Sequence, residues 1–174
     1  MSISSSKKIL GAVLAATLAQ QAAAAELAVQ LEIPRLNVAE YHRPYVAVWL
    51  EGERKDAHNL AVWYDLKMKD GEGSKWLKDL RQWWRRSGRD LSFPVDGMTS
   101  ATRAPGRHRL LFSGTDAALS RLPAGSYQLV IEIVREVGGR EVLTQPLVWP
   151  PKEAARFQLQ GREELGAVVI DVKP

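Results

Sequence analysis

Apolar and polar side chains alternate along most of the chain, which is the pattern of half-buried β-strands. Residues 27–33 form the first such run. Residues 44–51 and 59–66 flank a charged turn and are predicted to pair as a hairpin, with Trp49 and Trp63 on neighbouring strands. Further runs occupy residues 107–112, 122–133, 141–148, 157–160 and 165–172. About eight strands without alternating helices predict a mainly β fold, an antiparallel β-sandwich.

One segment has a helical period instead. Its apolar residues recur at spacings of three, four and seven, and charged residues fill the other positions. These apolar residues are Trp76, Leu77, Leu80, Trp83 and Trp84. Ser74 stands at the expected N-cap and Gly88 suits the C-terminal stop, so one helix is predicted over about 75–87. The sandwich is therefore predicted to carry one helical insertion.

The second half of the chain has a recognisable order of elements. A strand, a Gly-Thr-Asp turn, the corner Pro123-Ala124-Gly125-Ser126-Tyr127 and a long alternating strand follow one another. This order resembles the C-terminal half of immunoglobulin-like modules in bacterial surface and flagellar-hook assembly proteins. The resemblance implies an immunoglobulin-like antiparallel β-sandwich, in which Tyr127 buries its ring while its hydroxyl reaches the backbone, as in a tyrosine corner.

Residues 1–25 have the composition of a secretory signal peptide. The basic pair Lys7 and Lys8 precedes an apolar run that is too short to span a bilayer, and four alanines end the segment. Cleavage there is predicted to leave residues 26–174 as a single domain in the periplasm. We expect no membrane span in this mature chain.

Charge and cysteine content remove several classes of function from consideration. The net charge of +4 falls to +2 without Lys7 and Lys8, and basic and acidic residues are interleaved, so no nucleic-acid partner is expected. The chain has no cysteine, and hence no disulfide, thiolate metal site or Cys-linked haem. Because His42, His58 and His108 are scattered along the sequence, no metal site is predicted.

The segment Asp96–Gly106, between the predicted helix and the next strand, consists mostly of small or hydroxyl-bearing residues. It follows neither the strand nor the helix period, so we expect an exposed loop that offers a hydroxyl. The pattern Asp-x-x-Thr-(Gly or Ser)-Ala-Thr is matched by Asp96, Thr99, Ser100, Ala101 and Thr102.

This pattern resembles the motif that flavin transferases recognise in extracytoplasmic redox proteins. The resemblance implies that a transferase cleaves FAD and esterifies the FMN phosphate to Thr102, which makes FMN a covalent cofactor. Most such motifs have Gly where this chain has Ser100, and loss of that Gly removes easy access to positive φ. The other interpretation is a Ser/Thr-rich surface turn whose hydroxyls cap nearby backbone amides.

The aromatic face of the predicted helix also has two interpretations. The first is packing in the core, which accounts for any stripe of large apolar side chains. The second is that Trp83, Trp84 or Phe93, which lead into the loop, stack on a flavin ring or shield it. The two interpretations are compatible with each other.

Over about residues 28–172, the chain resembles an uncharacterised family of small predicted periplasmic proteins. This domain of unknown function is often encoded beside PepSY-containing membrane proteins and flavin transferases. The most specific parts are residues 43–51, 77–84, 96–106 and 123–127. The resemblance implies an extracytoplasmic electron carrier whose partners are a flavin transferase and a PepSY-type membrane protein. The alternative is a non-catalytic immunoglobulin-like accessory module that binds a membrane protein through a sheet edge or the Trp-rich face. In either case a free-standing enzyme is the less favoured interpretation.

Overall fold

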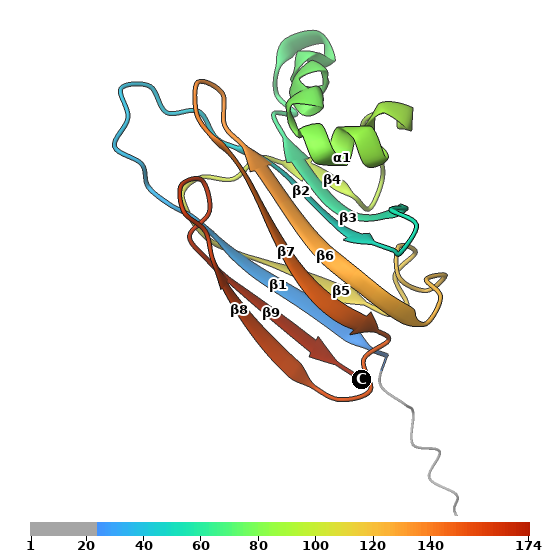
Figure 1. The fold of residues 1–174 in the computed structure, drawn as a ribbon. Coiled ribbons are helices and arrows are strands. Elements are labelled where there is room, and N and C mark those ends of the chain that lie inside the picture. Colours follow the sequence, from blue (N-terminus) through green and yellow to red (C-terminus); the bar gives the residue numbers. More distant parts are fainter. Residues whose placement is uncertain (1–23) are drawn as a thin grey trace, which may run out of the picture.

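Two β-sheets packed face to face form the body of the protein in the computed structural model, which describes residues 24–174 (Figure 1). The strands are β1 (Glu26–Ile33), β2 (Tyr45–Glu51), β3 (Ala57–Tyr64), β4 (Thr99–Ala101), β5 (Gly106–Ser113), β6 (Gly125–Val134), β7 (Arg140–Trp149), β8 (Ala155–Gln160) and β9 (Ala167–Lys173). One sheet has the order β5-β1-β9-β8 and the other the order β4-β3-β2-β6-β7. All neighbouring strands are antiparallel except β3 and β4, so the predicted β-sandwich is confirmed.

The main core lies between the two sheets and is built from alternate residues of their strands. On β1, Leu27, Val29 and Leu31 are fully buried in this core, as their spacing predicts. Trp63 pairs with Val46 across the hairpin and faces the same core. Trp49 lies on the opposite face of the sheet, so the two tryptophans occupy neighbouring strands without forming a cross-strand pair.

A layer of short helices covers the outer face of the five-stranded sheet (Figure 1). It consists of η1 (Lys69–Asp79), α1 (Arg81–Arg86) and η2 (Gly88–Asp90). Leu77, Leu80 and Trp83 are fully buried against Trp49 and its neighbours on β2, β3 and β6. The helical insertion therefore has its own small core, on the far side of the sheet from the main one.

The single helix predicted over residues 75–87 is divided into shorter segments. Leu80 breaks it with a non-helical backbone (φ −72°, ψ 71°), and the segment before the break is a 3₁₀-helix. Because a 3₁₀-helix has three residues per turn, Leu77 and Leu80 stack on one side and Trp76 is turned away from it. Trp76 is consequently 46% exposed. Ser74 donates a hydrogen bond to the carbonyl of Gly71 and is not an N-cap.

Glu132 ties the helical layer to the sheet. Its carboxylate is fully buried and accepts hydrogen bonds from the backbone N–H groups of Gln82 (3.0 Å) and Trp83 (2.7 Å). These N–H groups lie in the first turn of α1, where a helix has no internal acceptors for them. Arg140 Nε completes the cluster at 2.6 Å and supplies the opposite charge.

The tyrosine corner predicted at the start of β6 is confirmed. Tyr127 buries its ring in the main core, and its hydroxyl donates a hydrogen bond of 2.7 Å to the carbonyl of Pro123. The bond joins residues four positions apart and so fixes the approach of the chain to β6.

Glu141 fastens the β8–β9 connection to β7. Its carboxylate accepts hydrogen bonds from four successive backbone N–H groups at 2.7–3.2 Å, those of residues 162–165. Burial by itself raises the pKa of Glu141, but these four donors outweigh burial and hold the pKa below its ordinary value.

We expect Glu141→Gln to lower the free energy of unfolding at pH 7 by about 1.5–3 kcal/mol, the range for hydrogen bonds to a charged group. The folded-state pKa is depressed, so this stabilisation is complete above the unfolded-state pKa and is lost as pH falls through the folded-state value. Urea denaturation of both proteins at a series of pH values measures this difference in the free energy of unfolding. The difference between the two proteins should shrink on acidification; a difference that is constant from pH 7 to pH 3 would contradict this role.

Candidate functional site

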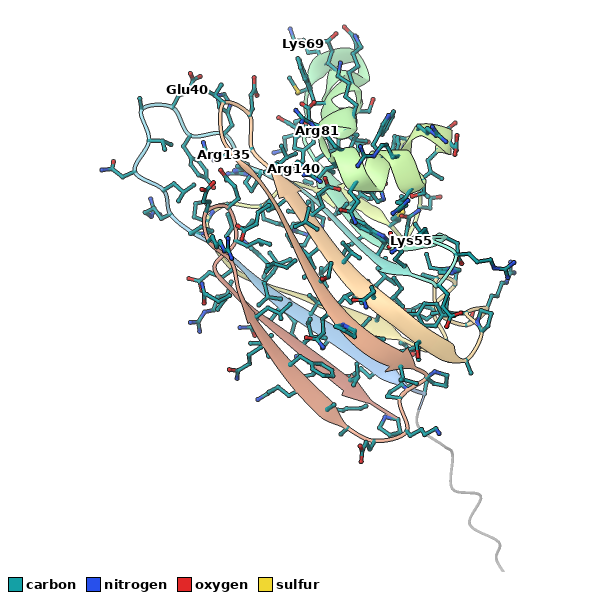
Figure 2. All side chains as sticks on the ribbon, viewed as in Figure 1. Glu40, Lys55, Lys69, Arg81, Arg135 and Arg140 are labelled. Atoms are coloured by element: carbon teal, nitrogen blue, oxygen red, sulfur yellow. The ribbon has the colours of Figure 1, made fainter. Side chains whose placement is uncertain are left out.

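A cavity of about 970 Å³ lies at the end of the sandwich where the β6–β7 hairpin, the segment before β2 and the η1 helix come together. This is the end away from the C-terminus in Figure 1, and Figure 2 shows Arg81, Arg135 and Arg140 gathered there. We call it the end cavity. Its lining comes from residues 41–45, 65–81, 101–102 and 134–140. The volume is at the upper end of the range for small-molecule sites.

Thr102 lines the end cavity together with Ala101. It follows β4 directly and is half-buried. Its N–H donates to the carbonyl of Tyr64 (3.0 Å), and its hydroxyl donates to the carbonyl of Pro44 (2.6 Å). The predicted acceptor hydroxyl is therefore held in a defined position at the cavity wall.

The prediction of an exposed loop without regular structure is wrong for residues 99–101, which form β4. These residues pair in parallel with Val62, Trp63 and Tyr64 of β3. The free edge of β3 offers backbone hydrogen-bonding groups, and the small side chains of this segment allow it to dock there. Tertiary pairing of this kind leaves no period in the sequence.

The other residues of the motif lie outside the cavity. Asp96 is exposed, and Ser100 is half-buried opposite Trp63. Thr99 Oγ1 accepts a hydrogen bond from the Val95 N–H (2.9 Å), which closes the turn that leads into β4. Of the five motif residues, only Ala101 and Thr102 reach the cavity.

Trp83 and Trp84 are placed in the helical layer and do not line the end cavity. Trp83 has no exposed surface, and its indole N–H donates to Asn59 Oδ1 (2.8 Å). Trp84 is half-buried, and its ring centroid lies 6.3 Å from that of Trp83. The ring centroid of Phe93 lies 5.8 Å from that of Trp83. Stacking of Trp83 on a flavin is incompatible with this burial, so its prediction as a ligand residue is corrected to a core role.

Several aromatic side chains of the end cavity were missed by sequence reasoning. The cavity is lined by Tyr41, Tyr45 and Trp76. Among the described residues, Trp76 is the most exposed tryptophan. Met68 and Val137 add exposed apolar surface to the same lining. An exposed apolar cluster around a cavity is typical of a binding site. The spacing of Trp76 to Leu80 indicates only a core face, so nothing in the sequence points to this role of Trp76.

The cavity lining carries more positive than negative charge, with five Lys or Arg residues against three acidic ones. Arg135 and Arg140 are engaged by Glu164 and Glu132. Within residues 24–174, neither Arg43 nor Arg81 has an ion-pair partner within 4.0 Å. Lys67 likewise has no ion pair among these residues, so three cationic side chains are free to balance an anionic ligand.

Arg135, which lines the cavity, belongs to a buried ion pair. Arg135 donates to both carboxylate oxygens of Glu164 at 3.0 Å and lies 5.8 Å from the ring centroid of Tyr41. Arg135 Nη1 and the Tyr41 hydroxyl have no hydrogen-bond partner among the described residues. Burial raises the pKa of Tyr41, which keeps this phenol neutral. The positive charge of Arg135 is balanced by Glu164.

Val137 marks the tip of the β6–β7 hairpin at the cavity. It is 80% exposed and adopts φ of 53°, a conformation that β-branched residues rarely adopt. Strain of this kind tends to occur at functional positions. The exposed side chain of Val137 is held over the cavity by the hairpin turn.

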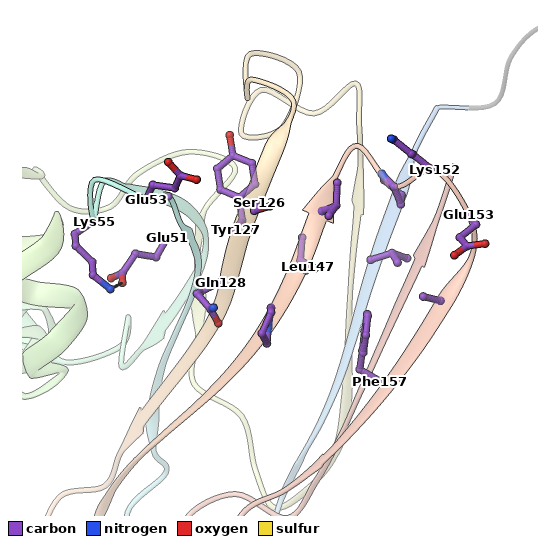
Figure 3. A pocket seen from close by; sticks show the side chains of 16 residues that line it. Glu51, Glu53, Lys55, Ser126, Tyr127, Gln128, Leu147, Lys152, Glu153 and Phe157 are labelled. Carbon is purple, nitrogen blue, oxygen red and sulfur yellow. Dashed lines mark hydrogen bonds and ion pairs between the residues drawn. The ribbon is translucent and has the colours of Figure 1, made fainter.

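A second cavity, of about 710 Å³, opens between β7 and β8, which are the edge strands of the two sheets (Figure 3). Leu147, Phe157 and Val172 supply apolar lining. Glu51 also lines it, but its carboxylate already binds Lys55 (3.0 Å) and Arg86 (2.8 Å). This groove contains none of the predicted site residues.

The three histidines lie apart from one another. His42 contacts Glu40 and Glu136, His58 contacts Asp56, and His108 contacts the carbonyl of Ala104. In the part of the chain that the structure describes, no group of three or more His, Asp or Glu side chains is placed to hold a metal ion.

The fold and the site define a small β-sandwich protein with a helical cover and a cation-rich cavity at one end. The chain belongs to the DUF2271 family of predicted periplasmic proteins, whose model matches residues 26–167. Comparisons with curated proteins and with solved structures gave no significant match. Among residues 24–174, no helix combines the length and the apolar composition that crossing a membrane requires. The predicted signal peptide, residues 1–25, falls almost wholly outside the described residues.

Proposed function

We infer that this protein is a periplasmic electron carrier with FMN attached covalently to Thr102. The observation that carries the proposal is the position of Thr102, which lines the end cavity of about 970 Å³ and whose hydroxyl is held by the Pro44 carbonyl. A tethered cofactor needs an acceptor hydroxyl beside a space that can hold it. Thr102 meets both requirements.

The charges near Thr102 suit a phosphoester. Arg43 immediately precedes Pro44, whose carbonyl accepts the Thr102 hydroxyl bond, and the guanidinium of Arg43 is exposed and free of ion pairs among the described residues. An attached phosphodiester carries one negative charge, which a guanidinium binds well. Arg103, on the other side of Thr102, is occupied by the ring of Trp63 at 5.3 Å. Arg43 is therefore the better placed counter-charge.

Attachment would be a group transfer from FAD by a separate transferase. The Thr102 oxygen bonds to the phosphorus of the FMN half, the pyrophosphate bond breaks, AMP leaves, and the hydroxyl proton passes to a base of the transferase. The hydrogen bond from Thr102 to Pro44 must break for this step. The three residues before the acceptor, Thr99, Ser100 and Ala101, are small, which lowers the steric barrier to the transferase on that side.

In the carrier role, FMN supplies the redox chemistry, and the protein binds, orients and shields it. A PepSY-type membrane protein is the proposed electron donor and a periplasmic protein the acceptor. The periplasmic description of the family supports this location.

We expect Thr102→Ala to abolish covalent FMN when the mature chain is co-expressed with a flavin transferase. Thr102→Ser should keep it, because the hydroxyl remains. Ser92→Ala is the matched control, since it removes an exposed hydroxyl that lies outside both the motif and the cavity. Intact mass spectrometry measures the gain of one FMN less one water. Retention of covalent FMN in Thr102→Ala would contradict the assignment.

A second candidate function is that of a non-catalytic accessory module for a membrane protein. The groove between β7 and β8 favours this candidate, because each of these strands is an edge of its sheet and the groove between them has apolar lining. An extended segment of a partner could pair with one of these edges. On this alternative, Thr102→Ala leaves the function unchanged. The same variant therefore separates the two candidates.

A further inference from the structure

We propose that the flavin ring carried by Thr102 lies inside the end cavity, stacked on Trp76, and is not free in solvent. This inference rests on the proposed attachment and adds a binding site for the isoalloxazine to it. Sequence reasoning pointed to Trp83 and Trp84 as stacking residues. The structure places both elsewhere and puts Trp76 on the cavity wall instead.

Trp76 presents much of its side chain to solvent. It is 46% exposed, whereas Trp49, Trp63 and Trp83 are essentially buried. Lys78 Nζ lies 5.6 Å from the centroid of its ring. Lys78 is a long, exposed side chain, so an aromatic ligand can take its place at little cost. Stacking on Trp76 would cover apolar surface that the protein otherwise leaves in water.

The attachment residue and the proposed stacking residue belong to the same cavity. Thr102 and Trp76 both line the end cavity, and its volume of about 970 Å³ suits a ligand of the size of FMN. Tyr41 and Tyr45 add aromatic surface to the same lining. A ring tethered at Thr102 therefore has a preformed aromatic cavity beside it.

A flavin changes charge when it is reduced, because its isoalloxazine gains negative charge on the pyrimidine side. Arg81 lines the cavity at the end of the molecule shown in Figure 2 and is free of ion pairs among the described residues, whereas Glu164 and Glu132 balance Arg135 and Arg140. Unpaired positive charge near the ring favours its reduced form. Arg81 can therefore stabilise the reduced flavin.

Fluorescence tests the inference, since tryptophan in contact with a flavin quenches its emission. In the FMN-loaded chain we expect strong quenching and weak access of iodide to the ring. Trp76→Phe should raise the emission several-fold, with residual quenching by the tyrosines. Trp84→Phe is the matched control, because it removes a tryptophan outside the cavity and should leave the emission unchanged. Near-ultraviolet circular dichroism checks that both variants are folded.

A loaded native chain as bright and as open to iodide as free FMN would overturn the inference while leaving the attachment intact. Equal changes of flavin emission in Trp76→Phe and Trp84→Phe would also overturn the inference. Titration of the Thr102→Ala chain with free riboflavin tests the cavity without any attachment. Saturable quenching that Trp76→Phe weakens is expected; no quenching at saturating riboflavin would count against the cavity even if FMN attaches to Thr102.

Discussion

Replacement of Glu132 with alanine is expected to lower the free energy of unfolding by about 3–5 kcal/mol, the range for breaking a buried ion pair from one side. The change leaves Arg140 without its partner and removes the acceptor for the N–H groups of Gln82 and Trp83. Glu132 is fully buried, so the Trp83 N–H loses its acceptor in a part of the fold away from solvent. Urea denaturation followed by tryptophan fluorescence measures the loss.

Glu136→Ala is the control for this prediction. Glu136 is an acidic residue in the turn between β6 and β7, 64% exposed, and its loss should change stability by no more than about 0.5 kcal/mol. A similar small effect of Glu132→Ala would contradict the role of Glu132 as the link between helical layer and sheet. Because that layer carries Trp76, loosening it should also disturb the end cavity.

Trp83→Ala is expected to lower the free energy of unfolding by about 3–5 kcal/mol, as for other large aromatic side chains removed from a core. The indole fills the space between α1 and the outer face of the sheet, and Asn59 loses a hydrogen-bond donor with it. Trp84→Ala is the matched comparison from the same helix, and it should cost less because Trp84 is only half-buried.

The same pair of variants decides between the two interpretations of the aromatic face. A core role predicts that Trp83→Ala unfolds at lower urea concentration while FMN loading of the folded fraction is unchanged. A stable Trp83→Ala chain with altered flavin spectra would contradict the assignment of Trp83 to the core.

Strands whose side chains alternate between core and solvent could be predicted from the sequence. β1 is an example, since Leu27, Val29 and Leu31 alternate with less buried residues and all reach the main core. β4 could not be predicted, because its three small residues are held only by the edge of β3. The break at Leu80 could not be predicted for a different reason: the spacing of three between Leu77 and Leu80 fits a 3₁₀-helix as well as an α-helix.

The candidate site was only partly accessible from the sequence. Thr102 could be selected because its motif is local. The cavity could not, since Arg43, Trp76, Thr102 and Arg140 come from four separate segments that only the fold brings together. The exposure of Trp76, which sets it apart from the other tryptophans of the helical layer, likewise depends on how that layer packs.

The most direct test of the central claim is the intact mass and visible spectrum of the mature protein, purified from a periplasm in which a flavin transferase is co-expressed with added Mg²⁺. The account predicts a mass increase of one FMN less one water, and a yellow absorbance that survives denaturation and maps to the peptide containing Thr102. An unmodified mass, under conditions that flavinylate a known substrate of the same transferase, would contradict it.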